Sequence, residues 1–208
     1  MNKLIKEIKY IKNSSVKNKV DKRLKEFKNF KNKNTKEWFS ELCFCILTAN
    51  SKAVTALKIQ EELTPKGFCE YSLNNVRKTI RKNKHRFYNN KAKYIIAVRK
   101  HIDIKNKIKG LGEIKAREWL VKNVKGLGYK EASHFLRNVG CKNLAILDRH
   151  ILNLMKEYNL IKEKPKTLNK KNYLEIETIF KKIADTLKMS CARLDLYMWY
   201  MKTGEVLK

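Results

Sequence analysis

Apolar residues recur at helical spacing along most of the chain, separated by charged and polar positions. Two such sets open it: Leu4, Ile8 and Ile11, followed by Val16, Val20, Leu24 and Phe27. Spacing of this kind places the apolar side chains on one face of a helix. The alternation that is typical of strands persists nowhere. We therefore predict an all-α protein with about ten to twelve helices.

The most apolar helix is expected near the middle of a domain. We predict that Thr35 caps it, and it carries Trp38, Phe39, Leu42, Phe44, Ile46 and Leu47. A helix that is apolar nearly all round is buried. The chain turns polar over residues 48–52, where Ser51 is the predicted cap of the next helix. Pro65 and Gly67 are expected to close that helix.

The same spacing predicts further helices toward the C-terminus. They are a short helix after Ser72, then 91–102, 113–123, 129–139, 149–158, a helix around 176–187 and a last one ending at Gly204. Gly140 suits a helix C-terminus, and Asp148 stands at an N-cap position. We expect two helical domains, residues 35–147 and residues 1–34 plus 148–208, with a binding cleft between them.

Glycine is concentrated in one region. Of seven glycines, five lie between residues 110 and 140: Gly110, Gly112, Gly126, Gly128 and Gly140. Gly126 and Gly128 separate two predicted helices and expose the N-terminus of the second, where free N–H groups suit a phosphate. Lys130 stands in the first turn of that helix, and Asp148 follows one helix later. A phosphate anchor, an amine and a carboxylate together indicate chemistry on a nucleic acid.

The charge balance supports a polyanionic partner. The chain has 49 Lys and Arg residues against 20 Asp and Glu, for a formal net charge of +29. Such an excess is typical of nucleic-acid binding. A lysine-rich chain with solvated helix faces and a membrane-surface protein are the alternatives. No apolar run of about 18 residues is present to span a bilayer, and the N-terminus is amphipathic and does not resemble a signal peptide.

The cysteine and histidine spacing predicts no metal site. The five cysteines (Cys43, Cys45, Cys69, Cys141, Cys191) form no CxxC, and the four histidines (His85, His101, His134, His150) have no ligand spacing. We expect reduced thiols in a cytoplasmic, DNA-associated protein and no cofactor. The histidines receive no role, apart from a phosphate contact considered for His150.

Three segments resemble one family in the expected order. The pattern from Gly126 to Lys130 with Asp148 resembles the helix-hairpin-helix superfamily of DNA glycosylases that carries a Gly/Pro-then-Asp motif. Residues 47–51 resemble its segment that meets the base opposite a lesion, and residues 87–95 its segment that wedges into the DNA stack. The short length and the terminal lysine make the chain most similar to the archaeal-type (second-type) 8-oxoguanine DNA glycosylase/AP lyases.

Two departures from the superfamily pattern refine the resemblance. Lys125 stands where many relatives have proline, which changes the rigidity of the hairpin more than its exposed N–H groups. Iron–sulfur relatives carry four cysteines after the catalytic acid, whereas this chain has only Cys191 there. The resemblance therefore does not extend to proteins like endonuclease III that hold a cluster.

The resemblance implies that Lys130 attacks the sugar C1′ and that Asp148 stabilises the cationic sugar and helps deprotonate the amine. Taken alone, Lys130 is a phosphate contact or a solvated residue, and Asp148 is an N-cap; the capping and catalytic readings of Asp148 are compatible. Asn50 is implied to contact the base opposite the lesion, with Arg86 reaching the same base. Phe87 or Tyr88 would stack in the DNA, although an isolated aromatic residue more often belongs to the core. The N–H groups around Gly126 and Gly128 would hold a phosphate.

The lesion pocket is the least determined part. The resemblance implies that Lys208, the last residue, recognises the damaged base through its terminal carboxylate, and Trp199 could stack on that base. The alternatives are a frayed terminus and a core tryptophan. We expect a monomeric enzyme that removes 8-oxoguanine from double-stranded DNA and then nicks the abasic site, with no membrane partner. A non-catalytic hairpin clamp and a relative that acts on another lesion remain the rival functions.

Overall fold

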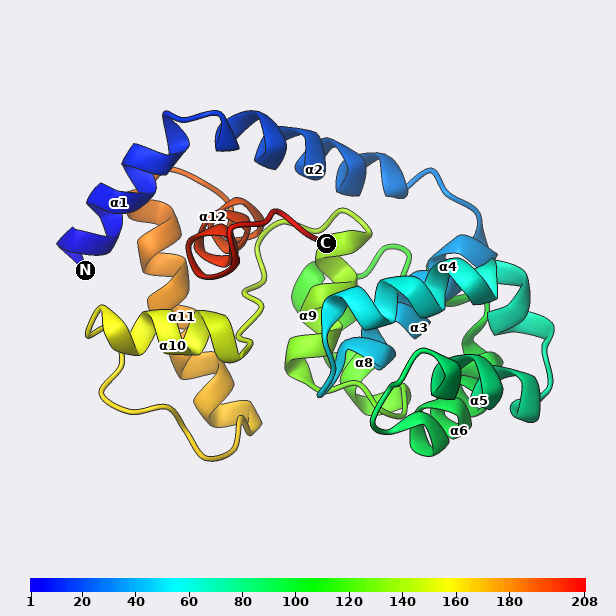
Figure 1. Cartoon of the computed structure of the whole chain (residues 1–208). Helices are drawn as coiled ribbons and strands as arrows, with labels where there is room; N and C mark the ends of the chain where they lie inside the picture. Colours follow the sequence, from blue (N-terminus) through cyan, green and yellow to red (C-terminus); the bar gives the residue numbers. More distant parts are fainter. The chain divides into compact units, whose positions relative to one another are not determined.

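The computed structural model describes residues 1–208 and contains twelve α-helices, one 3₁₀ helix and no strand (Figure 1). The all-α prediction is confirmed. The chain forms two compact units, residues 32–139 and residues 1–31 with 140–208. No helix is both long enough and apolar enough to cross a membrane.

The unit of residues 32–139 is built around one buried helix. Its elements are α3 (Thr35–Thr48), α4 (Ala53–Glu70), α5 (Leu73–Lys82), α6 (Tyr88–Ala97), η1 (Val98–His101), α7 (Ile104–Lys107), α8 (Glu113–Asn123) and α9 (Tyr129–Asn138). Helix α3 contacts α4, α6, α7 and α9, and every residue from 38 to 48 is buried. The predicted central place of this apolar helix is confirmed.

The second unit is centred on the last helix. Its elements are α1 (Asn2–Lys12), α2 (Val16–Phe30), α10 (Arg149–Glu157), α11 (Lys170–Thr186) and α12 (Cys191–Thr203). Helix α12 contacts the other four. It ends at Gly204, which has the left-handed conformation at φ 74° that favours glycine at a helix C-terminus. The expected end of this helix is confirmed.

Two predicted helix caps are wrong by one residue. Asn34, not Thr35, caps α3: its side chain accepts the Glu37 N–H, and the Glu37 carboxylate accepts the Asn34 N–H, each at 3.0 Å. Helix α4 follows Lys52, and no side chain caps it. Ser51 therefore does not have the predicted capping role.

Two predicted helix ends also move. Helix α4 runs through Pro65 to Glu70 because Thr64 adopts φ 57° and ψ 172°, which kinks the backbone and lets a second helical stretch begin at the proline. The helix expected from residue 91 begins earlier, at Tyr88, and passes after Ala97 into the 3₁₀ helix η1. All five cysteines are free thiols, as expected, and only Cys141 is not buried.

Candidate active site

The hairpin between α8 and α9 has the predicted form. Gly126 adopts φ +90°, and a Cβ there would lie 2.7 Å from Cδ2 of Tyr94 on α6. Position 126 therefore requires glycine both for its conformation and for the space. Lys125 places its Nζ 5.7 Å from the centre of the Tyr94 ring. The tyrosine thus supports the hairpin at the residue where many relatives have proline.

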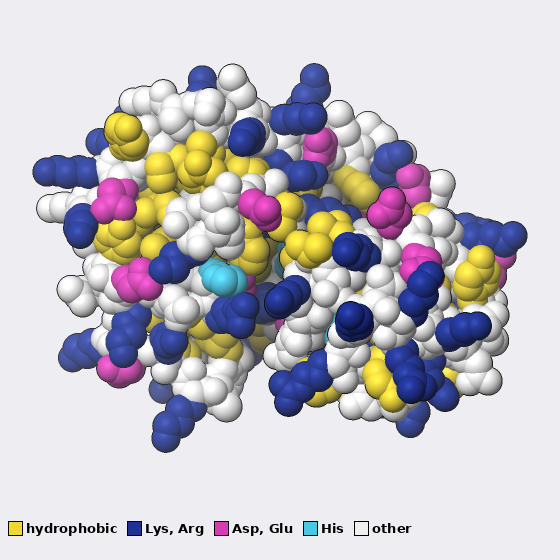
Figure 2. All heavy atoms as spheres, viewed as in Figure 1, with side chains coloured by type: hydrophobic (Ala, Val, Ile, Leu, Met, Phe, Trp, Pro, Cys, Tyr) yellow, Lys and Arg dark blue, Asp and Glu magenta, His cyan; other side chains and the backbone are white.

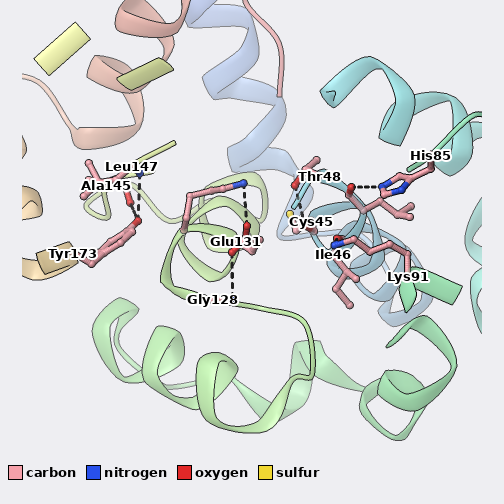
Figure 3. A network of polar contacts seen from close by, with 12 residues as sticks. Cys45, Ile46, Thr48, His85, Lys91, Gly128, Glu131, Ala145, Leu147 and Tyr173 are labelled. Carbon is pink, nitrogen blue, oxygen red and sulfur yellow. Dashed lines mark hydrogen bonds and ion pairs between the residues drawn. The ribbon is translucent and has the colours of Figure 1, made fainter. Parts of the chain in front are cut away.

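Lys130 lies in the first turn of α9 and is held by the next residue. Its Nζ is 3.1 Å from Oε1 of Glu131, and its side chain is 22% exposed. The other carboxylate oxygen of Glu131, Oε2, accepts the N–H of Gly128 at 3.2 Å, as the dashed line beside Gly128 marks (Figure 3). A phosphate at this helix N-terminus would have to compete with Glu131 for that N–H.

Asp148 caps α10, as predicted. Its backbone is extended, and its Oδ1 accepts the Ile151 N–H at 2.8 Å. The segment before it is buried and fixed by α11: the Tyr173 hydroxyl donates to the Ala145 carbonyl at 2.6 Å and accepts the Leu147 N–H at 3.4 Å (Figure 3). The cap leaves Asp148 half-buried at the start of the helix.

The C-terminus of α3 is tied to the segment of residues 85–91 by two buried side chains. His85 accepts the Phe87 N–H at Nδ1, 3.1 Å away, so that Nε2 carries the proton and donates to the Leu47 carbonyl at 2.9 Å. Burial lowers the pKa of His85, in agreement with this neutral form. Lys91 donates from Nζ to the Ile46 carbonyl at 2.6 Å (Figure 3).

Lys91 is a buried cation, only 5% exposed. The pKa of Lys91 is lowered to about 8: burial lowers it most, Glu131 raises it in part, and Lys130 adds a smaller lowering effect. Its position at the carboxyl end of α3 also places its charge against the negative end of the helix dipole.

The residues expected to meet DNA lie in the turn after α3 and in the segment between His85 and Lys91. Asn50 is exposed in the turn after α3 and has φ +60°. Arg86 is exposed, and its guanidinium lies 5.0 Å from the Phe87 ring centre. Arg81 lies 5.6 Å from the ring centre of Tyr88. Phe87 and Tyr88 are half-buried, so neither is a core residue.

A second group of cations lies on α5. We call Arg77, Lys78, Arg81 and Lys82 the α5 basic face, which lines a surface hollow together with Asn74. Lys82 binds Glu62 at 2.8 Å, and the buried Nε of Arg77 has no partner. Figure 2 shows Lys and Arg side chains gathered over the region where Figure 1 places α5 and α6. Like charges four residues apart repel one another, which favours an external anion here.

Trp199 and Lys208 lie in the other unit. Trp199, on α12, packs edge-on against His150 with ring centres 4.9 Å apart, and its buried Nε1 has no hydrogen-bond partner. Its ring is half-buried, as is Lys208 at the end of the chain. His150 thus contacts the tryptophan ring, and its considered phosphate contact stays a prediction.

A sequence model of the 8-oxoguanine DNA glycosylase family, Ogg-HhH, matches residues 20–189. The chain belongs to this family. An 8-oxoguanine DNA glycosylase/AP lyase of Methanocaldococcus jannaschii is 50% identical over 206 residues, which are 99% of each chain. The enzyme of the same description from Thermotoga maritima is 43% identical over 207 residues, again 99% of each chain.

Solved structures agree with this family assignment. The crystal structure of the Methanocaldococcus jannaschii 8-oxoguanine glycosylase/lyase, in complex with 15mer DNA containing 8-oxoguanine, has a TM-score of 0.96 at 49% identity and covers 99% of both chains. An endonuclease III–DNA complex matches with a TM-score of 0.58 at 19% identity, over 77% of this chain and 71% of the other. The latter match supports the shared helix-hairpin-helix fold alone.

Three side chains of this family member were not among the predicted site residues. Glu131, Lys91 and His85 join the hairpin and the end of α3 to their neighbours. Glu131 carried a usable signal, because an acid three residues after a helix-capping glycine matches the capping-box spacing. The roles of Lys91 and His85 had no local signal, since each binds a carbonyl far away in sequence.

Proposed function

We propose that this protein removes 8-oxoguanine from double-stranded DNA by attack of Lys130 and then nicks the abasic site. The observation that carries the proposal is the lysine in the first turn of α9, directly after the glycine hairpin, in a chain whose relatives over 99% of its length are 8-oxoguanine DNA glycosylase/AP lyases. Asp148 at the α10 N-cap supplies the acid that the resemblance requires.

The chemistry follows from an amine next to the sugar. Neutral Nζ of Lys130 forms a bond to C1′ while the glycosidic bond breaks and its electron pair leaves with the base, which takes up a proton. The nitrogen then loses a proton, the C1′–O4′ bond breaks, and O4′ leaves with its electron pair and takes up a proton, which gives an iminium between Nζ and C1′. Loss of a C2′ proton then expels the 3′ phosphate and cuts the strand. The carboxylate of Asp148 stabilises the cationic sugar during these steps.

The DNA contacts of the proposal come from the unit of residues 32–139. A base inside a duplex must be flipped out before the reaction, and the gap must be filled. Phe87 or Tyr88 would fill it, with Asn50 and Arg86 contacting the opposite base. The hairpin glycines would meet a phosphate beside the lesion, and the α5 basic face would contact phosphates farther along the duplex.

Trp199 and Lys208 form the proposed lesion-recognition pair. Trp199 offers a half-buried ring for stacking on the flipped base. 8-Oxoguanine differs from guanine by a proton at N7, so recognition requires an acceptor, which the terminal carboxylate of Lys208 can provide. We expect the enzyme to act as a monomer.

The decisive experiment is strand cleavage of a duplex with one 8-oxoguanine opposite cytosine, with borohydride added in a parallel sample. Borohydride reduces an iminium and fixes the protein to the DNA. We expect cleavage and a covalent adduct with the wild type. Lys130→Gln should bind the duplex without an adduct, whereas Lys125→Gln, in the same hairpin, should still form one.

The outcomes separate the rival functions. A normal adduct with Lys130→Gln would overturn the assignment of the nucleophile. An adduct on abasic DNA without excision of 8-oxoguanine would favour a lyase for another lesion. Binding without cleavage or an adduct would favour a non-catalytic hairpin clamp, and Asp148→Asn would then leave the behaviour of the protein unchanged.

A further inference from the structure

Glu131 uses its two carboxylate oxygens for two different partners. Oε1 lies 3.1 Å from Nζ of Lys130, and Oε2 accepts the Gly128 N–H at 3.2 Å. The Glu131 side chain is 13% exposed, less than the 22% of Lys130. Adjacent residues of a helix do not face each other, so the lysine must turn its side chain back toward the helix N-terminus to reach this oxygen.

We propose that Glu131 is a catalytic residue that holds the Lys130 amine at the hairpin and accepts its proton before attack. The carboxylate is fixed on one side by the hairpin N–H, so its other oxygen has a defined position against the amine. The inference rests on the proposed function of Lys130. It assigns the deprotonation step to Glu131 and leaves to Asp148 the stabilisation of the cationic sugar.

Charged groups on the neighbouring helices contact other partners. From α8, Glu118 accepts the Tyr129 hydroxyl at 2.7 Å, and Arg117 lies 5.2 Å from the same ring centre. From α3, Glu41 accepts from the Asn138 side chain at 2.7 Å, at the other end of α9. These contacts leave Glu131 as the carboxylate that faces the amine within this unit.

Lys91 of α6 is the remaining charge that acts on this pair. It interacts electrostatically with both Glu131 and Lys130. Its charge has the same sign as that of the Lys130 ammonium, and the Glu131 carboxylate interacts with both. The group therefore has three charges of alternating sign, and removal of a proton from Lys130 relieves the repulsion between the two lysines.

The proton accounting is direct. Nζ of Lys130 transfers one proton to Oε1 of Glu131, which gives a neutral amine and a neutral carboxylic acid. The nitrogen lone pair then forms the bond to C1′, and the glycosidic electron pair leaves with the base, which is protonated from solvent. Glu131 releases its proton to solvent before the next turnover. No oxidant or cofactor takes part.

The test is the substitution Glu131→Gln with single-turnover excision measured from pH 6 to 10. Glutamine can still accept the Gly128 N–H and so preserves the cap, but it cannot take a proton from the amine. We expect the rate at pH 7 to fall by about 100-fold, the lower range for a general base. The rate should then rise with pH toward the wild-type value as solvent removes the proton instead.

The rise above pH 9 is the informative part of the profile. Lys91 has a pKa of about 8 and is largely neutral by pH 9, so a rate of Glu131→Gln that keeps rising beyond that pH does not come from Lys91. Affinity for 8-oxoguanine DNA should not change by more than about two-fold. A rate equal to wild type at every pH, or one lowered by a constant factor at every pH, would overturn the proposal.

Glu37→Gln is the matched control. Glu37 occupies the same third position of α3, accepts the N–H of the capping residue at 3.0 Å and pairs with Lys33 at 2.9 Å. We expect its excision rate and pH profile to equal those of the wild type. A different result would overturn the proposed function itself: a borohydride adduct formed by Lys130→Gln. That result does not depend on the behaviour of Glu131→Gln, so the two failures can be told apart.

Discussion

Replacement of Lys91 by methionine should change how the stability of the protein depends on pH. Methionine approximates the shape of the lysine stem but carries no charge. In the wild type, burial lowers the pKa of Lys91 from 10.5 to about 8. The folded protein therefore binds fewer protons than the unfolded chain between these two values, and the stability contributed by this group rises with pH across that window.

The magnitude follows from the two pKa values. Holding the charge on Lys91 in the folded state costs about 3 kcal/mol below pH 8, at roughly 1.36 kcal/mol per pKa unit. The same linkage reduces that cost to about 1 kcal/mol at pH 10, so the wild type should gain about 2 kcal/mol relative to Lys91→Met between pH 8 and 10. Lys91→Met also loses the hydrogen bond to the Ile46 carbonyl, which changes the difference in unfolding free energy by an amount that does not depend on pH.

Urea unfolding of both proteins at several pH values from 7 to 10 measures this difference. Other lysines titrate in the same range, but they are common to both proteins and cancel in the subtraction. A difference in unfolding free energy that stays constant from pH 7 to 10 would refute the reasoning, because Lys91 would then ionise equally in the folded and unfolded chains.

Three other changes test separate parts of the site. Asp148→Asn should keep the helix cap, and with it thermal stability to within about 1 kcal/mol, while single-turnover excision falls steeply; unchanged excision would leave capping as the only role. Gly126→Ala should lower the unfolding free energy by about 1–3 kcal/mol in urea, because its positive φ and the Tyr94 ring both oppose a Cβ; a neutral result would contradict the strain. The pair Arg77→Gln and Lys78→Gln should reduce the slope of log affinity against log salt by about 0.9 for each phosphate that the variant no longer binds, measured by anisotropy on a long duplex; an unchanged slope would exclude the α5 basic face from DNA binding.

The apolar pattern was enough to predict the helices, and local geometry decided where they begin and end. Asn34 caps α3 instead of Thr35 because Glu37 completes a reciprocal pair with it. Pro65 read as a helix end, yet the kink at Thr64 turns the proline into the start of a second helical stretch. The choice of capping residue and the position of a kink depend on a few backbone angles that residue type alone does not specify.

The candidate site was predictable where its residues are close in sequence. The hairpin glycines and the cap at Asp148 followed from spacing, whereas the role proposed for Lys130 rests on the family resemblance as well. Lys91 could not be found in this way, because nothing in the sequence connects it to the Ile46 carbonyl that it binds. Its burial arises from packing between helices, and that packing is visible only in three dimensions.

The two ties at the end of α3 have a mechanical consequence. His85 and Lys91 lie on either side of the segment that carries Arg86, Phe87 and Tyr88. His85 binds the Leu47 carbonyl and Lys91 binds the Ile46 carbonyl, shortly before the turn at Asn50. We therefore expect the turn and the aromatic segment to keep a fixed separation, because a buried hydrogen bond joins them at each of these two carbonyls. In the proposed complex that separation is set by one histidine and one lysine side chain, so we expect the duplex, and not this part of the protein, to distort on binding.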